Sequence, residues 1–450
     1  MNIAYLTTEA VPFAKTGGLA DVCGTLPREV ANLGHRCAVI LPAFRQVYRA
    51  GIEIESTDIS FAIPMSRTKL VGGRLLRSKL PSCEVPVWLI DQPQYFDRDG
   101  LYGDQHGDYP DNAERFTFFC RAALAALTRI EMEVDLIHCN DWQTGLVPGL
   151  VRATPAQYAP LANAATVMTI HNMAYQGSFP ADAFRWTGLD WQFFHHDSFE
   201  FYDQLNFLKA GITTADEVTT VSPRYAAEIC TPEQGCGLDR VLAERRRSVV
   251  GIANGIDIDE WNPKTDVKLP ARFDADSWQD GKAFNKDSLQ SEFGLGTSRD
   301  TPLIGLVGRL AEQKGWDLIL PVIERHVIER RPTQWMILGS GDARIEQELK
   351  RLHDQAPDQV AIHLGFHDAL AHRIEAASDV FLMPSHYEPC GLNQLYSLRY
   401  GALPIVTATG GLADTVIDCT PETLADGTAT GFHLGEVSVD GLDQAIGRAL

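Results

Sequence analysis

The sequence has no apolar run long enough to cross a membrane, no C-x-x-C cysteine pair and no excess of positive charge. Its nine cysteines are scattered and odd in number, which argues against a disulfide framework or a structural zinc site. With 59 acidic and 39 basic residues and a net charge of −20, it lacks the basic surface of a nucleic-acid-binding protein. The opening MNIAYL reads as a strand and not as a cationic leader. These absences predict a cytoplasmic protein that binds neither membrane nor nucleic acid.

What the sequence does have is length and apolar content sufficient for two domains. A chain of 450 residues exceeds what one core usually supports, and 45% hydrophobic with 22% charged residues is typical of a globular protein. Apolar strands alternate with helical stretches in two series, separated near residue 250 by VVGIANGIDIDEWNPKTD, whose composition is typical of an interdomain connection. We predict an α/β protein with two Rossmann-like lobes, residues 1–252 and 253–450, each built on a parallel sheet covered by helices.

The two series can be assigned to particular segments. Predicted strands cover 2–7, 37–42, 84–90, 134–140, 165–172 and 217–222 in the first lobe, and 303–310, 334–342, 360–365, 379–385 and 403–407 in the second. Helical spacing is found over 19–33 and 113–130 and from residue 316 onward. Pro27 predicts a kink in the first of these helices or its division into two, and Gly34 is placed to end it.

The hexapeptide TGGLAD occurs twice, at residues 16–21 and 409–414, each time after an apolar strand and before a helical stretch. Paired glycines let the backbone turn sharply and approach a ligand, and a helix N-terminus presents N–H groups to anions. The threonine of each copy is also a candidate helix cap. Because ligands of open parallel sheets lie beyond the carboxyl ends of the strands, we expect one copy from each lobe to face a shared cleft.

Three cations stand close to such turns. Lys15 precedes the first glycine pair, Arg309 stands at the end of the apolar strand LIGLVGRL, and Lys314 follows that strand. The alternative for each is solvated surface charge. In a chain of strong negative charge, cations placed at strand ends indicate a specific anion site.

Several longer motifs resemble one family. KTGGLADV, YFDRDGLYG, DYPDNAERF, CNDWQTGLVP, IHNMAYQG, NGID, VGRLAEQKGWDLI, SHYEPCGLNQLYSLRYG and TGGLADTV run from residue 15 to about residue 416 in that family's order. The chain is similar to bacterial glycogen synthases and plant starch synthases. The resemblance implies a twin-Rossmann fold and transfer of glucose from ADP-glucose to the non-reducing 4-hydroxyl of an α-1,4-glucan such as glycogen, with retention. It implies no metal or other cofactor, and it leaves the oligomeric state open.

The resemblance also implies roles on the donor side, which it places mainly in the second lobe, with Lys15, Gly17, Gly18 and Asp21 coming from the first. Lys15, Arg309 and Lys314 would grip the diphosphate, with Asp21 orienting one of them, and Glu388 would contact the hydroxyls of the donor sugar. Phe366, where many members have tyrosine, would stack on the nucleobase. The remaining donor-binding residues implied are Gly17, Gly18, Asn254, Cys390, Gly391, Leu392, Thr409, Gly410 and Gly411.

Further roles concern the reacting centre and the acceptor, whose side the resemblance places in the first lobe. The resemblance implies that His171 lies against the 6-hydroxyl of the sugar and the reacting centre, and that Asp141 and Trp142 form an acceptor-side pair. Core packing is an equal alternative for Trp142. Cys390 is less suited to a nucleophile than to packing, since no His-Asp pattern surrounds it. Tyr396 stands where related retaining families carry a second glutamate.

Three alternatives remain open at this level. Three D-x-D pairs could hold a divalent ion: Asp97 with Asp99, Asp257 with Asp259, and Asp274 with Asp276. The chain could instead be a sucrose- or trehalose-type synthase, or a glucan-binding regulator without catalysis.

The sequence ends at GLDQAIGRAL, inside an apolar-periodic stretch. The family continues with helices that cross back to the N-terminal lobe, so we expect a C-terminally shortened chain.

Overall fold

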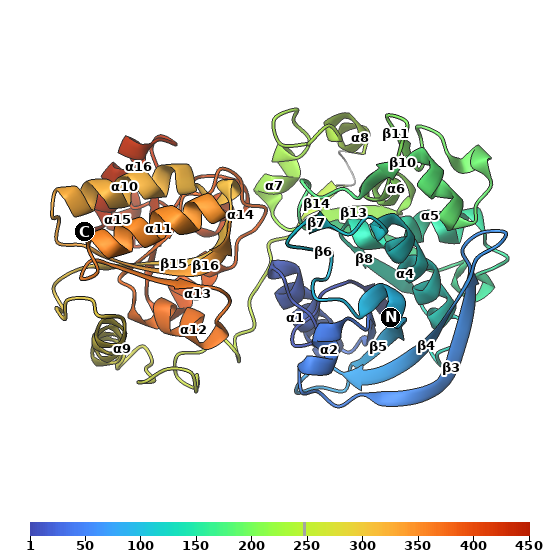
Figure 1. Ribbon diagram of the computed structural model, residues 1–450, viewed down its shortest axis with the longest axis horizontal. Coiled ribbons are helices and arrows are strands. Elements are labelled where there is room, and N and C mark those ends of the chain that lie inside the picture. The colour runs from blue at the N-terminus through green and yellow to red at the C-terminus, as the bar shows by residue number, and fades with distance from the viewer. Residues whose placement is uncertain (246–248) are drawn as a thin grey trace. The chain divides into compact units, whose positions relative to one another are not determined.

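The computed structural model describes residues 1–245 and 249–450. By its internal contacts the chain divides into two compact units, Met1–Ile252 and Ala253–Leu450, which carry the blue-to-green and the yellow-to-red elements of Figure 1. Each unit is a parallel α/β structure with a sheet of its own, as predicted from the sequence. Within the described residues no helix is both long and apolar enough to cross a membrane.

The first unit is built on a nine-stranded sheet with the order β14-β13-β9-β8-β1-β2-β5-β4-β3. Strands β14 to β5 in this order are parallel, and β4 and β3 join antiparallel at one edge. The strands are β1 Asn2–Leu6, β2 Arg36–Pro42, β3 Glu55–Pro64, β4 Leu70–Lys79, β5 Pro86–Asp91, β8 Leu136–Asn140, β9 Ala165–Ile170, β13 Glu217–Thr220 and β14 Val249–Gly251.

Helices and short strands complete this unit. The helices are α1 Gly18–Asn32, α2 Arg45–Arg49, α3 Pro93–Phe96, α4 Asn112–Leu127, α5 Leu146–Ala153, α6 Phe207–Thr214, α7 Pro223–Glu228 and α8 Asp239–Glu244. Short strands β10 Ser178–Pro180, β11 Glu200–Phe201 and β12 Gln204–Asn206 form a small antiparallel sheet, and β6 Gly103–Asp104 pairs with β7 Gly107–Asp108.

Two local predictions for this unit need correction. Helix α1 is continuous through Pro27, so the division into two helices is wrong, although Gly34 does follow its end with φ +92°. Residues 249–251, assigned from composition to the interdomain connection, form β14, which pairs with β13. Three residues of strand are too few to be visible in a segment dominated by Gly, Asn and Asp.

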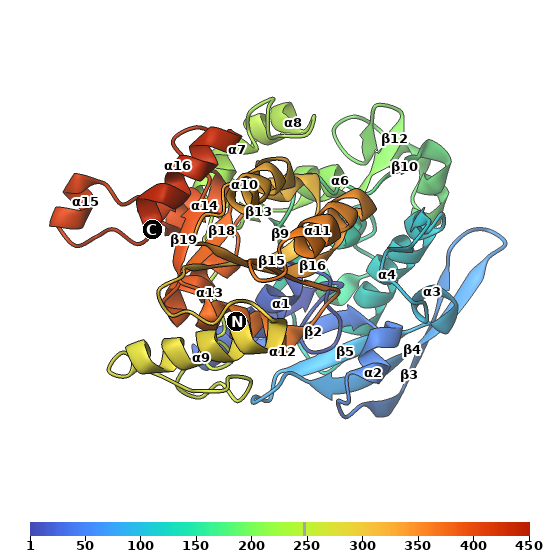
Figure 2. The same cartoon turned by 60° about the vertical axis from the view of Figure 1, so that its left-hand side comes forward.

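The second unit has a six-stranded parallel sheet with the order β17-β16-β15-β18-β19-β20. Its strands are β15 Leu303–Leu310, β16 Gln334–Gly341, β17 Val360–Leu364, β18 Val380–Met383, β19 Leu403–Val406 and β20 Phe432–His433. Its helices are α9 Trp278–Phe293, α10 Trp316–Ile328, α11 Ala343–Gln355, α12 Asp368–Ala377, α13 Asn393–Tyr400, α14 Gly410–Thr415, α15 Pro421–Ala425 and α16 Val439–Ala449. Figure 2 shows α10, α11 and α16 on one face of this sheet and α9, α12 and α13 on the other.

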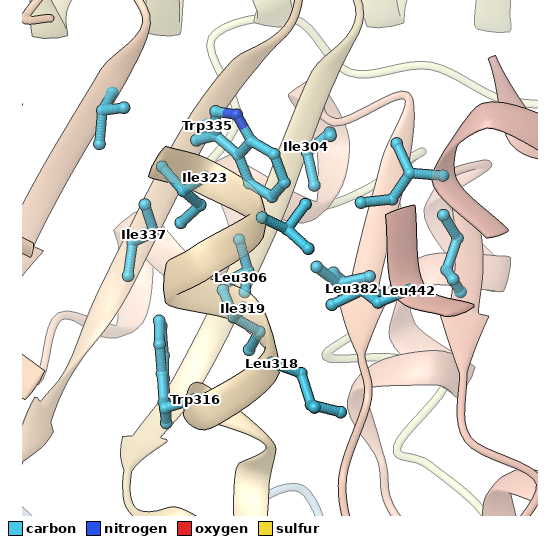
Figure 3. Packing of buried hydrophobic residues seen from close by; sticks show 14 of the residues in the cluster. Ile304, Leu306, Trp316, Leu318, Ile319, Ile323, Trp335, Ile337, Leu382 and Leu442 are labelled. Carbon is cyan, nitrogen blue, oxygen red and sulfur yellow. The ribbon is translucent and has the colours of Figure 1, made fainter. Parts of the chain in front are cut away.

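The core of the second unit follows from the alternation of side chains along its strands. Ile304, Leu306 and Trp335 point to the face covered by α10, where they pack against its apolar side chains (Figure 3). Met336 and Leu338 point to the opposite face and pack there in a second cluster. Strands buried on both faces are apolar throughout, which is why they were recognisable in the sequence.

Each sheet has one place where the chain changes direction across it. In the first unit the strands that follow β1 lie on its β2 side, and later strands continue from β8 on its other side. In the second unit β16 and β17 lie on one side of β15, and β18 to β20 lie on the other. Ligands of open α/β sheets bind at the carboxyl ends of the strands that flank such a switch point. The segments that follow β1, β8, β15 and β18 are therefore the places where a ligand is expected.

Candidate active site

The segment after β1 is organised around the buried carboxylate of Glu9. Its oxygens accept hydrogen bonds from the backbone N–H of Thr16 at 2.5 Å and of Gly17 at 3.1 Å, and from the Thr16 hydroxyl at 2.7 Å. The Tyr102 hydroxyl donates a further bond at 2.7 Å. The N–H groups of Thr16 and Gly17, which we expected to face a ligand, are thus held by Glu9. Gly17 is the N-cap residue of α1, and Thr16 makes no cap.

Lys15 and Asp21 form an ion pair, with Nζ 2.6 Å from Oδ1. Both side chains are partly exposed, at 31% and 21%. Next to them Gly18 is exposed, and a Cβ added at Gly17 would meet no atom within 4 Å. The first glycine turn therefore leaves open space beside a lysine that Asp21 holds in place.

Asp141 and His171 are brought together because β8 and β9 are neighbouring parallel strands. The Asp141 carboxylate accepts hydrogen bonds from the backbone N–H of His171 at 2.7 Å and of Asn172 at 3.3 Å. Burial raises the pKa of Asp141 to about 7, and these two donors only partly offset the effect. Its backbone has φ +56°, an uncommon value outside glycine. A carboxyl group poised between its two protonation states near neutral pH thus lies beside the histidine.

The His171 side chain has one described partner, the Oδ1 atom of Asn140, which lies 3.0 Å from Nε2. Burial, together with a smaller effect of the nearby His138, lowers the pKa of this imidazole to about 3. His171 is therefore neutral at physiological pH and suited to hydrogen bonding with a substrate.

Trp142 supports the packing interpretation. Only 9% of it is exposed, and its ring contacts those of Phe116, Phe179 and Phe207, with centroids 5.0, 5.9 and 5.9 Å away. Core packing is sufficient to explain this tryptophan.

In the second unit, Lys314 and Glu388 form an ion pair at the switch point, with 2.5 Å between Nζ and Oε2. Lys314 closes the short helix after β15, and Glu388 lies in the segment after β18. The Ser385 hydroxyl donates to the same carboxylate oxygen at 3.1 Å. Glu388 is 7% exposed. The arrangement holds an ammonium group and a carboxylate, each with capacity for further bonds, beyond the carboxyl ends of β15 and β18.

Arg309 is exposed at the end of β15, and its guanidinium donates to Gln313 Oε1 at 3.2 Å. Gln313 in turn donates to the carbonyl of Tyr387 at 3.1 Å, and the N–H of His386 donates to the Gln313 carbonyl at 2.9 Å. The segments after β15 and β18 are thereby tied together. Gly315 permits this, because a Cβ there would lie 2.2 Å from the carbonyl oxygen of Pro384.

The second glycine turn differs from the first. A Cβ at Gly410 would lie 2.0 Å from the carbonyl oxygen of Glu388, and one at Gly411 would lie 2.3 Å from that of Cys390. These glycines therefore admit the chain's own backbone, where we had expected the approach of a ligand. Thr409 is the N-cap residue of α14 but makes no side-chain cap, so capping explains neither threonine.

Asn254 lies near the Cys390 thiol, and its polar groups partly offset the effect of burial on the pKa of that thiol. Cys390 is 4% exposed, and burial raises its pKa to about 12, so a thiolate nucleophile is disfavoured. Gly391 has φ +70°, and Leu392 precedes α13 as its N-cap residue. Phe366, between β17 and α12, is 78% exposed and has no aromatic partner within the described residues.

Two of the three acidic pairs considered as metal ligands have members engaged in ion pairs. Asp97 and Asp99 both bind the guanidinium of Arg45, at 2.6 and 2.5 Å. Asp274 forms an ion pair with Lys264 at 3.1 Å. Elsewhere the side chains of Glu260, Asp368 and His372 come close enough to hold a cation.

The cluster of Glu260, Asp368 and His372 already contains a cation. The Lys268 ammonium lies 2.5 Å from Glu260, 2.6 Å from Asp368 and 3.1 Å from His372 Nε2. A lysine takes the place that a metal ion would need, so these residues fit an internal ion cluster better than a metal site.

Sequence reasoning missed Glu9, Asn140 and Gln313, which hydrogen-bond to predicted site residues, and Tyr102, which hydrogen-bonds to Glu9. Glu9 follows β1 after only Thr7 and Thr8, so its position near a strand end was a usable signal. The other three are recognisable only through their partners, because amide and phenol side chains show no distinctive spacing.

Residues 2–244 match the family model described as starch synthase catalytic domain, and residues 301–449 match the one described as glycosyl transferases group 1. The chain belongs to the glycogen and starch synthase family. A glycogen synthase of Rhodopirellula baltica is 62% identical over 458 residues, which cover 100% of this chain and 90% of the relative. One of Syntrophotalea carbinolica is 47% identical, with 100% and 91% covered.

Solved structures agree with this membership. The catalytic domain of starch synthase IV from Arabidopsis thaliana, bound to ADP and acarbose, has a TM-score of 0.89 at 34% identity, covering 99% of this chain and 91% of that one. The fold of this family member is thus the twin-Rossmann glycosyltransferase fold, and the protein is a hexosyltransferase of glycogen synthesis. Sucrose-phosphate synthase from Thermosynechococcus elongatus, at 18% identity and a TM-score of 0.56, shares the fold alone.

Proposed function

We propose that this synthase transfers glucose from ADP-glucose to the non-reducing 4-hydroxyl of an α-1,4-glucan with retention of configuration. The observation that carries the donor assignment is the Lys314–Glu388 pair beside Arg309 at the β15/β18 switch point. Cations beside a carboxylate suit a ligand that has both a diphosphate and sugar hydroxyls. The starch synthase neighbour bound to ADP supports an adenine nucleotide.

In this proposal Arg309 and Lys314, joined by Lys15, bind the diphosphate and stabilise the charge that develops on it as it leaves. Glu388 binds sugar hydroxyls. The bond from C1 to the diphosphate oxygen breaks, the acceptor 4-oxygen bonds to C1 on the same face, and its proton passes to the departing phosphate. Asp141 and His171, in the first unit, orient the sugar and the acceptor.

We further propose that the transfer needs no metal or other cofactor, because the three cations supply the charge stabilisation. The protein should keep its activity in excess EDTA, assayed as ADP release after dialysis. Loss of activity that Mg²⁺ or Mn²⁺ restores would assign a metal role to one of the acidic pairs.

The nine cysteines, all free in the structure, support a cytoplasmic location.

The test is ADP release from ADP-glucose with and without glycogen, combined with proton NMR of an elongated maltooligosaccharide. We expect release that depends on the glucan and a new linkage of α configuration. A glucan-binding regulator would release no ADP under either condition. A sucrose- or trehalose-type synthase would release nucleotide only with a small sugar acceptor, and a β linkage would contradict retention.

A further inference from the structure

Asn140, the last residue of β8, makes three hydrogen bonds through its buried amide. Nδ2 donates to the carbonyl of Leu6 at 3.1 Å and to that of His138 at 3.3 Å. Oδ1 lies 3.0 Å from Nε2 of His171. Backbone carbonyls only accept, so the amide cannot be turned around without setting its oxygen against both of them. The oxygen therefore faces His171, and Nε2 of His171 must carry a hydrogen.

The second nitrogen of His171 is then fixed as well. Because burial lowers the pKa of this imidazole to about 3, the ring holds one proton, and that proton is on Nε2. His138, the other titratable ring beside it, has a pKa lowered by burial to about 4 and bonds the Thr169 hydroxyl at 2.6 Å. Asp141 contacts the backbone N–H of His171 and not its ring. Nδ1 therefore has a lone pair, and within residues 1–245 and 249–450 no hydrogen bond to it is described.

We propose that Asn140 is a positioning residue that holds His171 in the Nε2–H tautomer, so that Nδ1 accepts a hydrogen bond from a hydroxyl of the donor sugar. The identity of the ligand, a donor sugar, rests on the function proposed above. The Nε2–H tautomer of His171 does not depend on that function. The alternative tautomer would present an N–H to the substrate and would leave Oδ1 of Asn140 facing a lone pair.

Two substitutions separate this role from a structural one. Asn140→Leu and Asn140→Asp both remove the amide donors to Leu6 and His138, so both carry the same structural lesion. Only Asn140→Asp keeps an acceptor opposite Nε2. The readout is nitrogen-15 NMR of histidine-labelled protein, with the His171 signals assigned by their loss in His171→Gln, together with kcat/KM for ADP-glucose.

We expect the wild type to show Nε2 protonated and Nδ1 unprotonated from about pH 6 to about pH 8. In Asn140→Leu the signals should shift towards a mixture of tautomers, with kcat/KM lowered about tenfold, the scale of one lost hydrogen bond. Asn140→Asp should keep the Nε2–H tautomer and most of the activity at about pH 8. It should lose activity at lower pH, since a new carboxylate favours protonation of Nδ1.

A wild-type protein with Nδ1 protonated would overturn the proposal. So would Asn140→Leu with an unchanged tautomer and the same loss of activity as Asn140→Asp. If the tautomer is as expected but His171→Gln leaves glucosyl transfer unchanged, the proposed role of His171 is wrong while the inference about Asn140 stands.

Discussion

Lys314 and Glu388, 74 residues apart in the chain, meet at 2.5 Å because the strands before them, β15 and β18, are neighbours in a parallel sheet. In the structure the ammonium binds the carboxylate. With ADP-glucose we expect the lysine to bind the diphosphate as well, and its contribution to grow as the bond to C1 breaks.

Lys314→Ala should therefore lower kcat about 100-fold or more while changing donor affinity less than about tenfold. Turnover comes from initial rates of ADP release, and affinity from calorimetry with ADP-glucose in the absence of acceptor. Lys286→Ala is the matched control, since Lys286 forms an ion pair of 2.6 Å with Asp379, which precedes the opposite end of β18. Equal losses in turnover and affinity for Lys314→Ala would remove the lysine from transition-state stabilisation.

Asp141 predicts an unusual dependence of stability on pH. Burial raises its folded-state pKa to about 7, so the folded protein holds a proton that the unfolded chain releases at about pH 4. The stability that this proton contributes is complete at acid pH and is lost as pH rises through about 7. Asp141→Asn should remove this decline, seen as a flatter melting temperature between about pH 5 and about pH 8.

Asp216→Asn is the control for that measurement. Hydrogen bonds from Thr166 and the charge of Arg152 keep the pKa of Asp216 low despite the opposing effect of burial. Asp216 is therefore ionised throughout the same range, and its replacement should leave the slope unchanged. An unchanged slope in Asp141→Asn would contradict the raised pKa.

Phe366 is expected to bind the nucleobase and to take no part in the chemistry. Phe366→Ala should raise KM for ADP-glucose about tenfold with little change in kcat, because base stacking contributes equally to ground and transition states. Ile328→Ala, which truncates a side chain of similar exposure at the end of α10, should change neither constant. A fall in kcat without a change in KM would assign Phe366 another role.

The strands of both sheets could be predicted because they are buried on two faces and apolar along their length. The β3–β4 hairpin was missed because β3 is mostly exposed and polar and β4 contains two glycines. Helix α9 was missed for a different reason. Its buried face carries Lys282, Asn285 and Lys286, whose nitrogens bind backbone carbonyls, so it shows no apolar periodicity.

The candidate site residues could be proposed from the sequence where they stand at strand ends. Lys314 and Glu388, like Asp141 and His171, were recognisable from position, and the strand order explains why each pair meets. The two TGGLAD copies could not be told apart in the sequence. Their surroundings decide what the glycines do, because Glu9 bonds the first copy and the Glu388–Cys390 backbone covers the second.

Competition between ADP-glucose and UDP-glucose in one reaction with glycogen tests the proposed function most directly. Measuring ADP and UDP release together gives the ratio of kcat/KM values without a separate assay for each donor. We predict a preference for ADP-glucose of about tenfold or more, since a purine gains more than uracil from stacking on Phe366. UDP-glucose used as well as ADP-glucose, or better, would contradict the proposed donor.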